Sequence, residues 1–230
     1  MRLRTCFCTM LSLCLPLVTR AQDAVPVYRE ARHKLVLDSL RFRILDVQIP
    51  ARDTTRYHIH DTPILYVSLL TSPTSAQVLG SEWPVTPASP PFATVGEVRI
   101  DSTYVQQPVT HRVTNAGDGT FRLLAIVSSG PARDSREEPG ILPGVIQLRS
   151  TWFRQSRIQL SARATTEWSE SESPVLVVLP FASSLAVESA SDARHALDTP
   201  GSWFLVPARA RYRITNAGSD VASAVVIQIR

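Results

Sequence analysis

All three cysteines of the 230-residue chain lie within its first 14 residues, at Cys6, Cys8 and Cys14. The chain beyond them can form no disulfide and offers no thiol nucleophile, so burial of apolar side chains must supply its stability. The sequence also lacks a Gly-rich phosphate loop, a serine nucleophile elbow and a His-Glu-x-x-His helix. The signatures of several common enzyme classes are therefore missing.

The sequence has no apolar run of the roughly twenty residues that a membrane-spanning helix requires. A shorter apolar run from Cys6 to Val18 follows Arg2 and Arg4 and leads to the small residue Ala21. This pattern predicts a signal peptide over residues 1–21, cut near Ala21. We expect a secreted or periplasmic protein with no transmembrane segment.

The sequence shows little excess of charge once this leader is removed. Its 24 basic and 20 acidic residues give a formal net charge of +4. Cleavage after Ala21 removes three arginines and no acid, which leaves 21 basic residues against 20 acidic ones and a charge of +1. Because no cluster of Lys or Arg remains, we do not expect nucleic acid as a partner.

The chain contains an internal repeat. Residues 50–67 read PARDTTRYHIHDTPILYV, and residues 161–178 read SARATTEWSESESPVLVV. Identical residues recur at an offset of 111 positions, as Ala51, Arg52, Thr54, Thr55, Pro63, Leu65 and Val67 match Ala162, Arg163, Thr165, Thr166, Pro174, Leu176 and Val178. Phe42-Arg43 recurs as Phe153-Arg154 at the same offset. Such self-similarity indicates two copies of one structural unit.

A second match lies at an offset of 101 positions, where residues 111–117 (HRVTNAG) match residues 212–218 (YRITNAG). The first copy therefore has the longer middle loop, which we assign to Pro84–Phe92 because its prolines exclude a central strand or a helix. The predicted organisation is a first repeat, a linker rich in proline, glycine and charge, and a second repeat, at residues 33–128, 129–144 and 145–230.

The hydrophobic pattern of each repeat is that of short strands, and no segment shows helical spacing with caps. Short apolar runs bounded by turn residues predict buried strands over Ile64–Leu70, Phe121–Val127, Val175–Leu179 and Val225–Ile229. The apolar alternation shifts by one position after Ile44, which predicts a β-bulge. Thr-Asn-Ala-Gly in both copies predicts a hairpin turn, because Asn and Gly tolerate positive φ. Two tandem small barrels or jelly rolls follow.

Three histidines form the candidate site. His58 and His60 are separated by one residue on a predicted strand, so both side chains point to the same face. His111 lies on another predicted strand, and the three imidazoles can converge inside a barrel if the two strands are neighbours. Neutral imidazoles bind Fe, Mn, Ni, Cu or Zn, and three of them leave coordination positions open for substrate.

The sequence His58-Ile59-His60, followed by His111 and then Asn115 four residues later, resembles the metal-binding motif of the cupins. Counted over both repeats, the resemblance covers nearly the whole chain after the leader and is that of a bicupin similar to quercetin dioxygenases. It implies an all-β fold of two tandem cupin-type jelly-roll β-barrels. It also implies a metal at the three histidines.

The chain departs from the cupin pattern in two respects. Ile64 and Leu65 stand where the family usually has a glutamate ligand, so the resemblance implies a three-histidine centre without the carboxylate. Arg52, Gln106 and Pro108 stand where the family usually has glycines and a proline in its loops.

The second repeat is degenerate at the site, since Ser169, Ser171 and Tyr212 replace the three histidines. That repeat is expected to fold without any histidine at these places. The requirements of the fold therefore do not explain the three histidines of the first repeat, which favours a functional role for them.

The remaining histidines and carboxylates are weaker candidates. We expect His33 and His195 at the surface, and Asp61 on the strand face opposite to His60. The acidic residues of the second repeat are predicted to form a solvated rim: Glu167, Glu170 and Glu172. The pair Glu137 and Glu138 belongs to the linker.

Three further side chains are candidates for the walls of the site. Ile64 and Phe121 are apolar neighbours that could wall the pocket. Tyr66 shares the histidine face only if no bulge intervenes at Pro63, and we expect it to pack in the core, with a place in the cavity wall as the alternative.

Two functions remain open at the level of sequence. The first is a metal-dependent dioxygenase acting on a small organic molecule, with the metal held by the three histidines. The second is a non-catalytic exported bicupin that binds a small ligand or a protein, which the loss of ligands from the second repeat favours. A sugar-phosphate isomerase ranks third because it would require a more polar and basic cavity. Association into a homodimer through sheet faces is also open.

Overall fold

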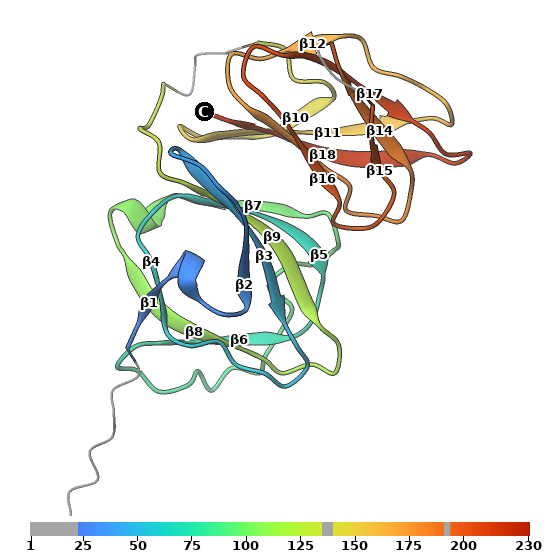
Figure 1. Ribbon diagram of the computed structural model, residues 1–230. Helices are drawn as coiled ribbons and strands as arrows, with labels where there is room; N and C mark the ends of the chain where they lie inside the picture. Colours follow the sequence, from blue (N-terminus) through green and yellow to red (C-terminus); the bar gives the residue numbers. More distant parts are fainter. Residues whose placement is uncertain (1–22, 135–139, 191–193) are drawn as a thin grey trace, which may run out of the picture.

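The computed structural model describes residues 23–134, 140–190 and 194–230, which form β-strands and two short 3-10 turns (Figure 1). The predicted signal peptide with its three cysteines, and the linker pair Glu137 and Glu138, lie outside these residues. In the described ranges, no helix has the length and apolar character needed to cross a membrane.

The first unit is made of two facing sheets. The five-stranded sheet has the order β2-β3-β9-β5-β7, and the four-stranded sheet has the order β1-β4-β8-β6. The strands are β1 (Val25–Pro26), β2 (His33–Asp38), β3 (Phe42–Ile49), β4 (His58–His60), β5 (Ile64–Leu70), β6 (Thr74–Val78), β7 (Val98–Asp101), β8 (Val109–Asn115) and β9 (Phe121–Ser128). The 3-10 turns are η1 (Val27–Arg29) and η2 (Thr103–Val105).

The second unit repeats this arrangement. Its five-stranded sheet has the order β10-β11-β18-β13-β16, and its four-stranded sheet has the order β12-β17-β14-β15. The strands are β10 (Val145–Arg149), β11 (Phe153–Leu160), β12 (Ser169–Glu170), β13 (Val175–Val178), β14 (Leu185–Ser189), β15 (His195–Leu197), β16 (Trp203–Val206), β17 (Arg211–Asn216) and β18 (Ala222–Ile229). The all-β architecture of two tandem jelly rolls is thereby confirmed.

The repeat is visible in local contacts as well as in strand order. The hydroxyls of Thr54 and Thr114 lie 2.9 Å apart, and those of their counterparts Thr165 and Thr215 lie 3.1 Å apart. Each pair forms an isolated β-bridge between the segment after the first long strand of its unit and the strand that ends in Asn115 or Asn216. The sequence repeat therefore reflects a repeat of hydrogen bonds.

Strand β3 does not contain the predicted bulge. It pairs with β9 without interruption from Phe42 to Ile49, and the register shift lies instead in the neighbouring strand β2, between Leu35 and Leu37. The apolar pattern changes register because both faces of β3 are buried. Phe42 and Ile44 face the second unit, whereas Leu45 and the apolar residues after it on that face line the interior of the first barrel.

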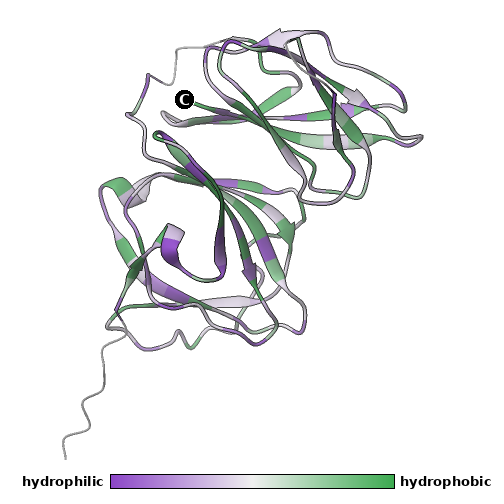
Figure 2. Cartoon of the chain, viewed as in Figure 1, coloured by the Kyte–Doolittle hydropathy of each residue, from purple (hydrophilic) through white to green (hydrophobic). Residues whose placement is uncertain are grey.

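The two units pack against each other through their five-stranded sheets (Figure 2). One cluster of buried apolar side chains contains residues of both sheets, among them the repeat-related pairs Phe42 with Phe153 and Leu65 with Leu176. At about 25 cal/mol per Å² of buried apolar surface, such sheet packing is a large stabilising contribution. The repeats therefore associate within one chain.

The Thr-Asn-Ala-Gly segments are not hairpin turns. Strands β8 and β9 belong to different sheets, and neither Asn115 nor Asn216 has positive φ. Each Asn instead crosslinks the chain through its side chain: Asn115 Nδ2 donates to carbonyl oxygens of Ile49, Pro50 and Gly119 at 2.8–3.1 Å. Asn216 Nδ2 donates in the same way to the carbonyl oxygens of Leu160, Ser161 and Asp220. These prediction errors arose because a buried Asn and a turn Asn look alike in sequence.

The longer loop of the first unit contains the proline-rich segment to which we assigned it. Residues 79–97 join β6 to β7, and within Pro84–Phe92 only Ser89 forms a β-bridge, to Thr74. The end of this loop returns to the barrel, where Phe92 is 4% exposed and joins the interior apolar cluster.

Candidate metal centre

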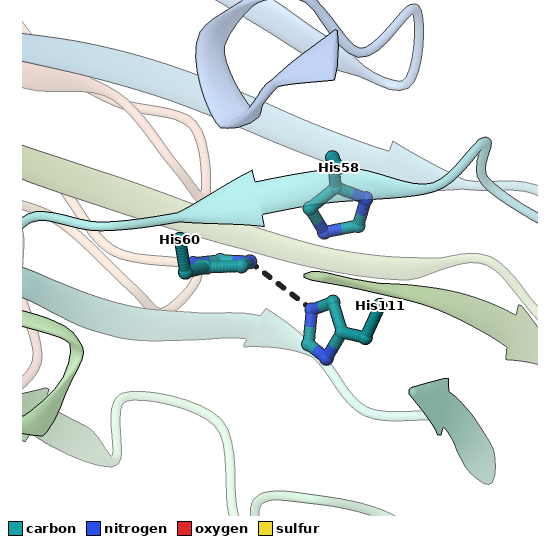
Figure 3. Close-up of side chains that lie close together, drawn as sticks. All are labelled: His58, His60 and His111. Atoms are coloured by element: carbon teal, nitrogen blue, oxygen red, sulfur yellow. Dashed lines mark hydrogen bonds between the residues drawn. The ribbon is translucent and has the colours of Figure 1, made fainter. Parts of the chain in front are cut away.

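Strands β4 and β8 bring the three histidines together. His58 lies directly opposite His111 in the antiparallel pair, and His60 lies two residues further along β4. Alternate residues of a strand share a face, so His58 and His60 both point into the barrel. Figure 3 shows the three rings turned toward one another from these two strands. The strand pairing on which the site depends is thus present.

The three rings are in close contact. One ring nitrogen of each histidine lies within 4.8 Å of one from each of the others. His60 Nε2 and His111 Nε2 lie 3.1 Å apart (Figure 3). His58 is 1% and His60 4% exposed, and His111 is half-buried. Such a cluster could hold a metal ion.

The hydrogen bonds of the histidines leave nitrogens available to a ligand. His58 Nδ1 lies 3.0 Å from the carbonyl oxygen of Arg56, so a neutral ring donates there and keeps its Nε2 lone pair free. Metal-binding histidines commonly have a backbone carbonyl as the partner of the second nitrogen. His60 Nδ1 is buried and has no hydrogen-bond partner in the described part of the chain.

Burial keeps these imidazoles neutral. Desolvation, followed by repulsion from the neighbouring histidines, lowers the pKa of His60 to about 2. Desolvation and the proximity of His58 lower the pKa of His111 to about 3. Burial also lowers the pKa of His58, although its bond to the carbonyl of Arg56 acts in the opposite direction. At neutral pH all three rings therefore offer lone pairs rather than positive charge.

The expectation that His33 lies at the surface is wrong. It is 6% exposed, and the centroid of its ring lies 4.7 Å from that of His58 in an edge-to-face contact. His33 begins β2 in the opposite sheet, and both Val27 and His33 line the cavity at the site. No periodicity within the N-terminal segment marks this position, because the contact is made across the barrel.

A cavity of about 330 Å³ adjoins the histidine cluster inside the first barrel. Its walls are mainly apolar and include Val47, Ile49, Phe121 and Leu123. This volume is at the lower end of the range for sites that take small organic ligands. Phe121 lines the cavity as expected, whereas Ile64 belongs to the same apolar cluster but is not among the residues that line the cavity.

Two tyrosines provide polar groups within the cavity. Tyr66 lines it although β4 ends at His60 and Tyr66 lies on β5 of the other sheet, so the expectation of core packing alone is wrong. Tyr104 from turn η2 lies beside His60 with ring centroids 4.8 Å apart. Burial and the nearby Asp101 raise the pKa of Tyr104, and burial and Tyr104 raise that of Tyr66. Both phenols therefore keep their protons at neutral pH. Tyr104 was missed because no motif surrounds it.

Arg99 lies at the edge of the same cavity. Its Nε donates to Glu97 Oε1 at 2.8 Å, and its guanidinium lies 5.1 Å from the centroid of the Phe92 ring. A guanidinium at a cavity wall can bind a carboxylate.

The other candidates lie away from the cluster, as expected. Asp61 is exposed beside β4, and His195 is exposed in the second unit, where its ring stacks on Phe204 at 3.9 Å. The acidic residues of the predicted rim are exposed: Glu167, Glu170 and Glu172.

Among its described residues, the second unit carries no equivalent cluster. Ser169 lies opposite Tyr212, as His58 lies opposite His111, but Tyr212 is fully buried in the apolar core. Ser171 donates to the carbonyl of Ser173 and accepts from Gln228 Nε2. Within the residues that the structure describes, the only group of three potential metal ligands is that of the first unit.

Solved structures share this fold at very low sequence identity. Salicylate 1,2-dioxygenase from Pseudoaminobacter salicylatoxidans, in complex with gentisate, is 12% identical with a TM-score of 0.61, over 89% of this chain and 76% of that one. AerE from Microcystis aeruginosa is 9% identical with a TM-score of 0.58, over 87% and 98% of the two chains. The cupin 2 conserved barrel domain protein from Leptotrichia buccalis is 8% identical with a TM-score of 0.54, over 85% and 87%.

No family model and no curated protein matches the sequence. The similarity to solved structures therefore shows the fold alone. The chain has the structure of the cupins over most of its length.

Proposed function

We propose that the protein is an exported metal-dependent dioxygenase of cupin fold that acts on a small organic molecule. In this proposal, His58, His60 and His111 hold a divalent transition metal. The observation that carries it is the convergence of three neutral imidazoles, two buried and one half-buried, with one nitrogen of each within 4.8 Å of the others, beside a mainly apolar cavity.

The separation of the His60 and His111 nitrogens fits a shared ion. Two nitrogens that each lie about 2.1 Å from one metal are about 3.0 Å apart at a right angle and about 3.4 Å apart at the tetrahedral angle. The 3.1 Å between His60 Nε2 and His111 Nε2 falls within that interval. Three imidazoles suit Fe, Mn, Ni, Cu or Zn and leave positions open for other ligands.

The protein supplies a dry, shaped cavity to this centre. A bound divalent ion would contribute Lewis acidity and open coordination positions. The apolar walls would exclude water, and the Tyr104 ring beside His60 would form part of the wall next to the metal. Arg99 would pair with a carboxylate at the edge of the cavity. Together with the similarity to a salicylate dioxygenase, these features favour small aromatic acids as the first substrates to test.

A non-catalytic role remains the alternative. No carboxylate joins the three histidines among the described residues, and the second unit has a filled apolar core in place of a site. Such a protein would bind a small ligand in the same cavity without turnover.

The test is elemental analysis of protein purified without a metal-binding tag. We expect about one equivalent of a divalent transition metal in the parent and little in a His58→Ala, His60→Ala double variant. A His195→Ala variant is the matched control, because it removes an exposed histidine from the other unit. No metal in the parent after reconstitution would refute the proposed centre.

Oxygen uptake with salicylate, gentisate and related aromatic acids separates the two functions. Uptake by the metal-loaded parent that is lost in the double variant supports the dioxygenase. Saturable ligand binding without uptake supports the binding protein.

The proposed export depends on residues 1–21 and has its own test. Expression with the leader intact should give a secreted or periplasmic protein whose N-terminus, read by peptide mass spectrometry, begins near Gln22.

A further inference from the structure

The N-terminal segment of the described chain links the two sheets at the candidate metal centre. Strand β1 runs parallel to β4, with Val25 opposite His58. The chain then turns through η1 and enters the other sheet at His33, which pairs with Val47. This path places a fourth imidazole next to the three that β4 and β8 provide.

His33 is held in a defined tautomer. Its Nδ1 lies 2.7 Å from the carbonyl oxygen of Val27, so a neutral ring donates its proton there. The lone pair of the neutral ring must then be on Nε2, on the other side of the imidazole. His58 is held in the same way by the carbonyl of Arg56. A backbone carbonyl on the second nitrogen is the pattern that orients histidines toward a metal.

The surroundings of His33 favour a role at the site rather than in core packing alone. The residue is 6% exposed, lines the same cavity as the three histidines, and contacts the ring of His58 at 4.7 Å between centroids. The three-histidine group contains no carboxylate, and three nitrogens leave up to three positions of an octahedral ion unfilled.

We propose that His33 Nε2 is a fourth protein ligand of the metal, so that the centre has four imidazoles. This rests on the proposed function, since it requires that the metal binds. His33 lies beside His58 and outside the group of three, so coordination would draw its ring inward. The fourth imidazole would then take the place of a carboxylate ligand.

The test counts imidazoles around Cu(II) added to the metal-free protein, using pulsed EPR of their remote nitrogens. We expect four in the parent and three in a His33→Asn variant. Asn places its amide nitrogen close to the position of His Nδ1, so the variant keeps a donor for the Val27 carbonyl and removes Nε2. We expect the affinity for Cu(II) to fall by more than roughly 100-fold, because loss of a residue that only supports a ligand already costs about 10- to 100-fold.

The outcomes separate this inference from the one it rests on. Three imidazoles in the parent, with the same count and affinity in His33→Asn, would overturn the role of His33 and leave the three-histidine centre intact. Failure of the parent to bind Cu(II) would overturn both. The count in the parent decides the matter even if His33→Asn does not fold. His195→Asn should match the parent in every measurement.

Discussion

Replacement of Asn115 by Ala tests whether its side chain stabilises the barrel and positions the metal centre. The amide donates to three carbonyl oxygens, and its Oδ1 accepts from Ser72 Oγ at 2.7 Å and from the Gly117 N–H at 3.0 Å. The residue is fully buried, so water would not replace the lost amide as the hydrogen-bond partner of these groups. At about 1 kcal/mol for each lost hydrogen bond, allowing for the bonds that share one N–H, we expect a loss of roughly 3–4 kcal/mol.

Asn216→Ala is the matched variant in the second unit. Asn216 is also fully buried and makes the equivalent bonds to three carbonyl oxygens and to the Gly218 N–H. Urea denaturation followed by circular dichroism should therefore show a similar loss of stability in both variants. This comparison separates general destabilisation from effects on the site.

Only Asn115→Ala should weaken metal binding. Asn115 ends β8, the strand that carries His111, whereas Asn216 ends the strand that carries the non-ligating Tyr212. We expect Zn(II) affinity to fall by roughly 10- to 100-fold in Asn115→Ala, the range for loss of a residue that supports a ligand. A cost below about 1 kcal/mol in either variant, or equal weakening of metal binding in both, would refute this reasoning.

Two further predictions concern the interface between the units and the effect of pH. Leu65→Ala and Leu176→Ala each remove a fully buried side chain from the cluster between the sheets, and each should lower the free energy of unfolding in urea by about 2–5 kcal/mol. The control Leu40→Ala removes an exposed side chain and should lower it by less than about 0.5 kcal/mol. Equal losses in the three variants would contradict the interface. The metal-free protein should lose stability as the pH falls below about 6.5, because the folded pKa values of His60 and His111, about 2 and 3, lie below that of an unfolded histidine, which then binds more protons. The loss at pH 5 should be about 2 kcal/mol for a single such histidine, and an unfolding free energy that stays constant from pH 7 to pH 5 would contradict the burial of neutral rings.

The all-β class, the two repeated units and the shared face of His58 and His60 could all be predicted from the sequence. Each depends on the order of residues over short distances, through the two-residue period of a strand or through direct self-similarity. The matched Leu65 and Leu176 illustrate this, since they occupy equivalent buried positions in the two units. The second repeat also indicated that the fold does not require the three histidines.

Only the tertiary structure decided which distant segments meet. His33 reaches the centre because the chain crosses from β1 in one sheet to β2 in the other, and no local pattern records that path. Phe42 and Ile44 interrupt the apolar alternation because a second barrel covers their face, which a strand considered alone does not reveal. Asn115 acts through carbonyl groups as far as 66 positions away in the chain. Contacts of this kind depend on how whole sheets pack, and the period of a single strand carries no information about its partners.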